Sequence, residues 1–316
     1  ANAMCPMGKE GDEIIVSCQD HEANAGAWRR LAERGIKVTE WHVNSETGML
    51  HIDDLAGLFT DRIKMVAFPH CSNVIGHINP VKTISQMAHE QGALCVVDGV
   101  AYAPHGFPDL KSLGADIYLF SLYKTYGPHL GLMYVDKDIL GKMENQSHFF
   151  KEGVSRSMIT PAGPDHAQIG SVCGILDYFD AVYNHHFNEE GTPAERNIQL
   201  NRLFRDHEKA LMQPLFEFLR SREDIRILGP HEAEGRMPTI SILPLSKDLE
   251  KVYANLTDHK LMLGTGDFYA VRPLMDMGIP SDPGVLRMSF LHYTSSEEIE
   301  QLIDGLKLAL DNVPDS

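Results

Sequence analysis

The stretch Ile117-Tyr-Leu-Phe-Ser-Leu-Tyr-Lys124-Thr-Tyr-Gly-Pro128 decides the fold of this chain. Its first residues form an apolar run that is typical of a buried strand, and Lys124 stands just beyond the end of that strand. A second apolar run, Ala93-Leu-Cys-Val-Val97, ends in Asp98-Gly99. Because ligands of open α/β sheets bind outside the carboxyl ends of the strands, we expect an amine and a carboxylate to meet at one edge of a sheet.

The residues around this stretch alternate between short apolar runs and segments with helical spacing. We predict helices over 22–34, 53–59 and 81–91, and strands over 14–17, 38–43, 64–69, 93–98, 117–121 and 131–135. Nearly continuous apolar strands that alternate with helices are typical of a mostly parallel sheet covered by helices. The first half of the chain is therefore predicted to be α/β.

The pattern changes after Gly153. We predict helices over 169–183, 193–222, 246–259 and from Ser295 onward, with strands over 239–243 and 286–290. Pro193 suits the first turn of the long helix, where its missing N–H is not needed. We expect a large domain over residues 1–185, then a connecting helix and a smaller α+β domain over residues 186–316.

Composition limits the classes of partner. The chain has 316 residues, is 43% hydrophobic and carries a formal charge of -16, which argues against nucleic acid as a partner because nucleic acid is bound through cationic side chains. No apolar stretch approaches the roughly 20 residues of a membrane-spanning helix, and no signal peptide opens the chain. We expect a cytoplasmic protein that contacts neither membrane nor nucleic acid.

The cysteines and the first residues add two expectations. An odd number of widely spaced cysteines suits reduced thiols better than a disulfide framework; they are Cys5, Cys18, Cys71, Cys95 and Cys173. The chain begins Ala1-Asn-Ala-Met without an initiator methionine, and from this we expect that an N-terminal part of the large domain is missing.

The pair Asp98 and Lys124 suits one kind of chemistry. A lysine that forms a Schiff base with a pyridoxal cofactor needs a carboxylate that keeps the pyridine nitrogen protonated. Three further motifs join the pair in order along the chain: Asp20-His-Glu-Ala-Asn24, Pro69-His-Cys-Ser-Asn73-Val-Ile-Gly76 and Val285-Leu-Arg287-Met-Ser-Phe-Leu-His-Tyr-Thr294.

Together these motifs resemble the class V aminotransferase family, a group of fold-type I pyridoxal phosphate enzymes that includes the cysteine desulfurases. The resemblance covers residues 11–135 closely and the C-terminal part more loosely. It implies pyridoxal 5'-phosphate as cofactor, a homodimer, and an amino acid or amine as substrate. A fold-type I transferase has a mostly parallel sheet in its large domain, which agrees with the pattern above.

The resemblance implies catalytic roles for two residues and an anchor for the cofactor ring. Lys124 matches the Schiff-base lysine, which later moves the proton at the α-carbon of the substrate. His21 matches the histidine that stacks on the ring, with a capping or core histidine as the alternative. Asp98 matches the partner of the pyridine nitrogen, with a turn aspartate as the alternative.

Further positions match the surroundings of the cofactor and substrate. Asn73 matches the residue that binds the phenolic oxygen, unless it is a simple turn residue. Ser121 and Tyr123 match phosphate-side positions, although desulfurases of the family have a histidine at the second. Ala101 occupies a cofactor-side position where many members have glutamine. Arg287 matches the arginine that binds the substrate's carboxylate through its planar fork, with a structural salt bridge as the alternative.

Some family features have no counterpart here. The phosphate-binding turn that members carry upstream of the first strand is absent from the sequence, and Gly163 stands near the place of a threonine that relatives supply across a dimer interface. Desulfurases also need a nucleophilic thiolate on the loop before the arginine. Phe268 or Tyr269 stands there, while Cys71 is expected to be a packed thiol.

We therefore predict a pyridoxal phosphate enzyme of the aminotransferase type. A cysteine desulfurase, or a selenocysteine or β-lyase activity, is the alternative reaction, and a non-catalytic interaction protein is the alternative of another class. Asp267, Tyr269 and Arg272 are candidates for substrate choice. No metal site is predicted, because no Cys or His pair has ligand spacing.

Overall fold

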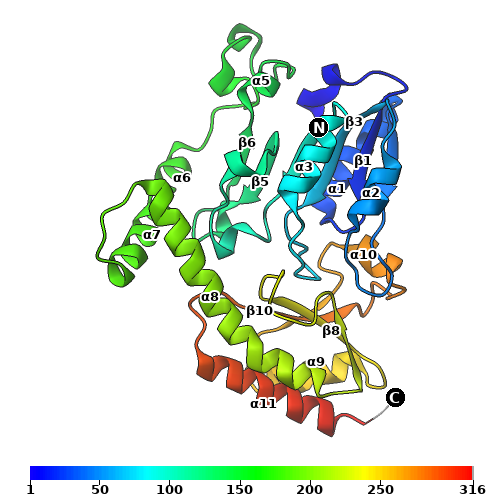
Figure 1. Ribbon diagram of the computed structural model, residues 1–316, viewed down its shortest axis with the longest axis vertical. Coiled ribbons are helices and arrows are strands. Elements are labelled where there is room, and N and C mark those ends of the chain that lie inside the picture. Colours follow the sequence, from blue (N-terminus) through cyan, green and yellow to red (C-terminus); the bar gives the residue numbers. More distant parts are fainter. Residues whose placement is uncertain (315–316) are drawn as a thin grey trace.

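The computed structural model describes residues 1–314, with the side chains of residues 5–7 outside the description. Two sheets and a long helix between them organise the chain (Figure 1). Among the described residues, none of the helices combines the length and the hydropathy needed to cross a membrane.

The first sheet has six strands in the order β2-β1-β3-β4-β5-β6. All neighbouring pairs are parallel except β5 and β6, which are antiparallel, so the predicted mostly parallel sheet is confirmed. The strands are β1 (Glu13–Ser17), β2 (Lys37–Trp41), β3 (Ile63–Pro69), β4 (Leu94–Asp98), β5 (Ile117–Ser121) and β6 (Gly131–Val135).

Helices cover both faces of this sheet, because the side chains of each strand alternate between them. On β1, Ile15 packs into one core with α2 and α3, whereas Ile14 and Val16 pack into another with α1. The helices of this half are α1 (Glu22–Arg29), α2 (Ile52–Leu58), α3 (Val81–Glu90), α4 (Leu110–Leu113) and α5 (Lys137–Leu140).

The predicted helix over 22–34 has two parts. The α-helix ends at Arg29, and residues 30–34 continue as a 3₁₀ helix that stops at Gly35 with φ 79°. The predicted helix over 169–183 is likewise divided. It corresponds to α6 (His166–Ser171) and α7 (Cys173–His186).

The long helix α8 (Pro193–Arg220) joins the two sheets (Figure 1). A capping box between Thr192 and Glu195 begins it. Its first half contributes Leu200 and Phe204 to the core around the large sheet, and its second half contributes five apolar residues to the core of the small sheet. One helix is thus built into both hydrophobic cores.

The second sheet is antiparallel, in the order β7-β8-β10-β9. Its strands are β7 (Ile225–Leu228), β8 (Thr239–Pro244), β9 (Gly264–Gly266) and β10 (Val285–Ser289), and the helices of this half are α9 (Leu249–Asp258), α10 (Val271–Asp276) and α11 (Ser296–Asn312). Two strands, β7 and β9, and helix α10 are not among the predicted elements. They are short, and β9 contains two glycines, which weaken any strand pattern.

The register of the large sheet brings the predicted motifs to one edge. Pro69 pairs with Asp98, and Asp98 pairs with Leu119 on the next strand. Residues that follow β1, β3, β4 and β5 therefore lie near one another. Gly99 is required at this edge, because a Cβ there would lie 2.1 Å from the ring of Tyr118.

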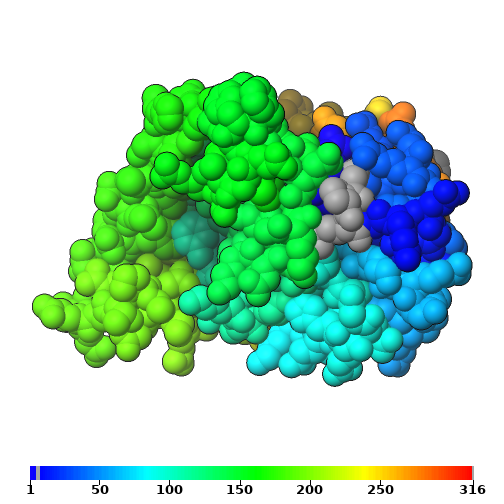
Figure 2. All heavy atoms as spheres, turned by 90° about the horizontal axis from the view of Figure 1, so that it is seen from above, coloured from blue at the N-terminus to red at the C-terminus, as the bar shows by residue number. Residues whose placement is uncertain are grey.

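The opposite end of the large sheet is closed by the N-terminal residues and the segment that follows β6. Met4 packs with Ile139, Met143 and Met158 in one core. The amide of Glu144 donates a hydrogen bond to the carbonyl of Ala3 at 2.8 Å. Figure 2 looks onto this part of the molecule, where the green residues after β6 stand beside the dark-blue N-terminal residues.

The shared helix α8 allows a direct test of core packing. Leu215 is fully buried, whereas Ile198 on the same helix is 64% exposed. Leu215→Ala should lower the free energy of unfolding by about 2–5 kcal/mol through lost contacts and a cavity. Ile198→Ala should change it by less than about 0.5 kcal/mol. Denaturant unfolding of the two variants measures both, and equal effects would contradict this packing.

Candidate active site

A cavity of about 110 Å³ lies at the carboxyl edge of the large sheet. Seven of the eight predicted site residues line it, together with Asp20 and Cys71. The predicted residues that line it are His21, Asn73, Asp98, Ala101, Ser121, Tyr123 and Lys124.

A second cavity of about 410 Å³ adjoins the first. Asn73, Ala101, Tyr123 and Lys124 line both, and the eighth predicted residue, Arg287, lines the second. The fold therefore brings all eight positions to two connected cavities, although their roles remain predictions.

Asp98 is the last residue of β4 and is only 7% exposed. The amide of Val100 donates to its Oδ1 at 2.8 Å, so Asp98 makes an aspartate turn as well as lining the cavity. Burial raises the pKa of Asp98 to about 6, against the Val100 hydrogen bond and the Lys124 charge, which both lower it. The carboxylate is held in place by a backbone donor and lies in a poorly solvated position.

Lys124 ends a short 3₁₀ turn, Leu122–Lys124, directly after β5. Lys124 is exposed as a whole residue, yet surrounding protein atoms desolvate its ammonium group. Desolvation and the charge of Arg287 lower the pKa of Lys124, while Asp98 raises it. A lysine with a lowered pKa supplies more of the neutral amine that attacks a carbonyl.

His21 combines the two roles that the sequence left open. It is the N-cap of α1, where its Nδ1 accepts a hydrogen bond from the amide of Ala23 at 3.0 Å, and it also lines the cavity. Desolvation, Lys124 and Arg287 lower the pKa of His21. Since Nδ1 is an acceptor, the neutral imidazole carries its proton on Nε2.

Arg287 on β10 is positioned by two groups. Its guanidinium lies 3.7 Å from the centroid of the Phe268 ring, and its Nη1 donates to the carbonyl of Asn73 at 2.8 Å. The side-chain amide of Asn73 in turn donates to the carbonyl of Phe268 at 2.9 Å. The contacts among these three residues fix the orientation of the Arg287 side chain. Burial lowers the pKa of Arg287 to about 10, which leaves it charged at neutral pH.

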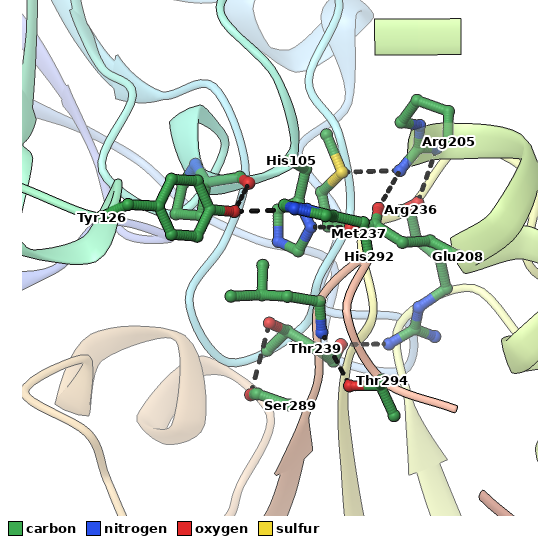
Figure 3. A network of polar contacts seen from close by, with 12 residues as sticks. His105, Tyr126, Arg205, Glu208, Arg236, Met237, Thr239, Ser289, His292 and Thr294 are labelled. Atoms are coloured by element: carbon green, nitrogen blue, oxygen red, sulfur yellow. Dashed lines mark hydrogen bonds and ion pairs between the residues drawn. The ribbon is translucent and has the colours of Figure 1, made fainter. Parts of the chain in front are cut away.

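Figure 3 shows a polar network behind the second cavity, to which the sequence analysis gave no role although His292 stands in the quoted motif around Arg287. His105 lines that cavity, and its Nδ1 lies 2.7 Å from Oε1 of the fully buried Glu208 on α8. His292 stacks on Phe204 with ring centroids 3.7 Å apart and bonds the hydroxyl of Tyr178 at 2.6 Å. These partners come from distant parts of the chain, so no local motif points to them.

The thiols whose side chains are described are all free, namely Cys18, Cys71, Cys95 and Cys173. Only Cys71 lines the first cavity. Its thiol donates to the carbonyl of Gly76 at 3.3 Å, and burial raises its pKa to about 12. Because the thiolate is the nucleophile, the burial of Cys71 favours the protonated, packed thiol that the sequence predicts.

The fold also assembles a group that the sequence did not indicate as a metal site. Potential ligand atoms of Cys18, His42 and Asp276 lie within 4.8 Å of one another. Nδ1 of His42 already bonds Oδ1 of Asp276 at 2.9 Å, and the guanidinium of Arg29 lies 3.9 Å from the sulfur of Cys18. The group is organised as a hydrogen-bonded pair beside a buried thiol.

Comparison with known proteins agrees with this geometry. The family model described as aminotransferase class-V matches residues 1–154 and 196–302. The chain belongs to the class-V aminotransferase family. Members of this family use pyridoxal phosphate as cofactor, and the six-stranded sheet with its covering helices is the fold-type I arrangement.

The names of individual relatives describe different activities. The aminotransferase-like protein FGM3 of Gibberella zeae is 32% identical over 95% of this chain and 73% of its own length. A cysteine desulfurase of Pectobacterium carotovorum is 30% identical over 94% of this chain and 70% of its own length. The crystal structure of the cysteine desulfurase CsdA from Escherichia coli superposes with a TM-score of 0.82 at 22% identity, over 99% of this chain and 75% of that one.

The residues of the first cavity fit pyridoxal phosphate chemically. A buried carboxylate, Asp98, suits a protonated pyridine nitrogen, and Lys124 suits the carbonyl carbon. The buried Oδ1 of Asn73 has no hydrogen-bond partner among the described residues, which leaves an acceptor at the cavity wall. Ser121 and Tyr123 add hydroxyl groups on the Lys124 side.

The raised pKa of Asp98 predicts a pH dependence of cofactor binding. As the pH falls through about 6, Asp98 takes up a proton and loses the charge that attracts the pyridine nitrogen. The affinity for pyridoxal phosphate should then fall by up to about tenfold per pH unit. Fluorescence titration between pH 5 and 8 measures this. Asp98→Asn should bind weakly at every pH, and an unchanged wild-type slope in that variant would contradict the assignment.

Proposed function

We propose that the protein is a pyridoxal phosphate-dependent enzyme of the aminotransferase type that acts on an α-amino acid. The observation that carries the proposal is the joint placement of Lys124 and Asp98 in one cavity, with Arg287 on the adjoining one. An amine, an acid and a carboxylate-binding cation are the three groups that this chemistry requires.

Each of these side chains has a physical task in the proposal. When bound, the cofactor withdraws electrons from the α-carbon of the substrate. Arg287 binds the α-carboxylate with two parallel hydrogen bonds and so orients the α-carbon. Lys124, once it is a free amine, accepts the proton from the α-carbon. Asp98 would hold the pyridine nitrogen through its negative charge, and His21 would offer a ring face with a proton on Nε2.

A lyase or cysteine desulfurase reaction is the second candidate, supported by the names of several relatives. It shares the groups described above but also needs a reactive thiolate. Among the cysteines whose side chains are described, none is a reactive thiolate at the cavity, since Cys71 is buried and protonated. The loop position expected to hold a thiol has Phe268 and Tyr269, and Phe268 packs on Arg287. The aminotransferase reaction is therefore preferred.

Lys124→Ala tests the proposal directly. Wild-type protein with pyridoxal phosphate should show a visible absorption band that the variant lacks, because Lys124 is the one lysine among the described residues that lines the first cavity. Lys111→Ala, which removes an exposed lysine of α4, serves as the matched control and should keep the band. Adding single amino acids should shift the band for the substrate class.

Two results would contradict this assignment. A band of equal strength in Lys124→Ala would show that another amine reacts. The absence of a band from all three proteins would favour the alternative of a non-catalytic interaction protein.

Arg287 should govern substrate binding and not the cofactor band. Arg287→Ala should raise KM for the amino acid by about 10- to 100-fold, as expected for loss of a charge-assisted hydrogen-bond pair. Arg287→Lys should restore only part of the lost substrate affinity, because an ammonium group lacks the planar fork of a guanidinium. Arg202→Ala, on the exposed side of α8, should leave KM unchanged. A fully active Arg287→Ala would place the carboxylate elsewhere.

Two further expectations belong to the same proposal. Phe149 and Phe150 are 86% and 67% exposed, and a second copy of the chain would cover such an apolar surface in a homodimer. Buried free thiols at Cys18, Cys71 and Cys95 suit a reducing compartment such as the cytoplasm.

A further inference from the structure

Asp20 is a second carboxyl group in the first cavity, and the proposed function gives it no role. It follows β1 and is only 2% exposed. It lines the same cavity of about 110 Å³ as Asp98 and Lys124. A buried carboxyl beside a cofactor position needs an explanation, because burying an unpaired charge is costly.

Helix α1 holds Asp20 in one orientation. The side-chain amide of Asn24 donates to Oδ2 of Asp20 at 2.5 Å, and the indole of Trp28 donates to Oδ1 of Asn24 at 2.8 Å. All three side chains are buried. These two hydrogen bonds therefore fix which oxygen of Asp20 has a hydrogen-bond donor and which has none.

The remaining oxygen, Oδ1 of Asp20, is fully buried and has no hydrogen-bond partner within the part of the chain that the structure describes. An ionised carboxylate accepts hydrogen bonds at both oxygens, whereas a protonated carboxyl has one O–H to donate. Among the described side chains, Asn24 donates to Oδ2 of Asp20, and none donates to Oδ1. This arrangement suits a carboxyl group that keeps its proton.

The charges around Asp20 act in the same direction. Burial and the nearby Asp98 raise the pKa of Asp20 well above its usual range, against smaller opposing effects of Asn24, the His21 amide and Arg29. Two carboxyl groups that share a poorly solvated site do not ionise together readily. The titratable and charged groups that face Asp20 from α1 and from the cavity are His21, Arg29, Cys71, Asp98, Tyr123 and Lys124.

Asp98 is the better site for the single charge. Its Oδ1 has the backbone donor of Val100, and Lys124 stabilises its charged form. Asp20 has one side-chain donor and an unsatisfied oxygen. The two environments differ enough to assign the charge to one carboxyl and the proton to the other.

We propose that Asp20 is a positioning residue that acts as the neutral carboxyl of the cavity, so that the negative charge resides on Asp98. This inference rests on the proposed function, in which Asp98 faces the pyridine nitrogen. One pyridine nitrogen needs one carboxylate, and a second charge in the cavity would remain uncompensated. The neutral Asp20 supplies polarity and shape at the cavity wall without that extra charge.

The first test uses the protein without cofactor. The pKa of Asp20 is raised in the folded state, so its contribution to stability is full below the pKa of the unfolded chain and is lost as the pH rises through the folded pKa. Asp20→Asn, which is neutral and of the same shape, removes this loss. As the pH rises above the usual range of an aspartate pKa, the stability of Asp20→Asn relative to wild type should therefore increase, by up to about tenfold in the unfolding constant per pH unit, until Asp20 itself ionises.

The second test measures cofactor binding. Asp20→Asn should keep the affinity for pyridoxal phosphate within about threefold of wild type at pH 8, while Asp98→Asn should lose at least about tenfold, the equivalent of one hydrogen bond to a charge. Asp20→Ala removes the shape as well as the proton and should bind less well than Asp20→Asn. Rescue by the neutral isostere is the result expected of a residue that works uncharged.

Two outcomes would overturn the inference. One is Asp20→Asn with a stability profile parallel to wild type. The other is a loss of cofactor affinity in Asp20→Asn that equals the loss in Asp98→Asn, which would make Asp20 a charged anchor.

A third measurement needs no variant. Carbon-13 spectra of aspartate-labelled wild type should show one carboxyl that is still protonated after Asp98 and the exposed aspartates have ionised, and ionisation of all carboxyls together would also overturn the inference. Failure of the proposed function looks different, because Asp98→Asn would then bind as wild type while the stability profile of Asp20→Asn still differed.

Discussion

The register of four parallel strands, β1, β3, β4 and β5, is the constraint on which the candidate site depends. Backbone hydrogen bonds between them align Pro69 with Asp98 and Asp98 with Leu119. Residues that follow each strand then lie side by side, although they are separated by dozens of positions in the chain. A shift of one residue in any strand would turn its side chains to the other face of the sheet. The residues that line the cavity would then no longer lie together.

Charges and burial then shift the pKa values of the groups that the strand register brings together. Desolvation disfavours the charged forms of both Asp98 and Lys124, and the charge of each partly offsets this effect on the other. Arg287 adds a second cation that lowers the pKa of Lys124 and of His21. The arrangement favours a neutral amine and a neutral imidazole next to fixed charges. Such divergent environments are characteristic of sites that transfer protons.

Much of this arrangement could be predicted from the sequence, because Asp98 and Lys124 directly follow apolar strands whose parallel order was evident. The contact of Arg287 with Phe268 could not, since it depends on how the small sheet meets the large one. The pair His105 and Glu208 was equally hidden, because neither residue stands in a local motif. Strand β9 escaped prediction because three residues with two glycines carry no strand pattern.

Helix α8 has a consequence for cooperativity. Leu200 and Phe204 belong to one core and Leu211 and Leu215 to the other, with about four helical turns between the first and the last. Glu208 lies between these groups and holds His105 at the second cavity. Fraying of the helix on either side would disturb that contact, so we expect the two sheets to unfold together. The geometry of the second cavity therefore depends on packing in both halves of the chain.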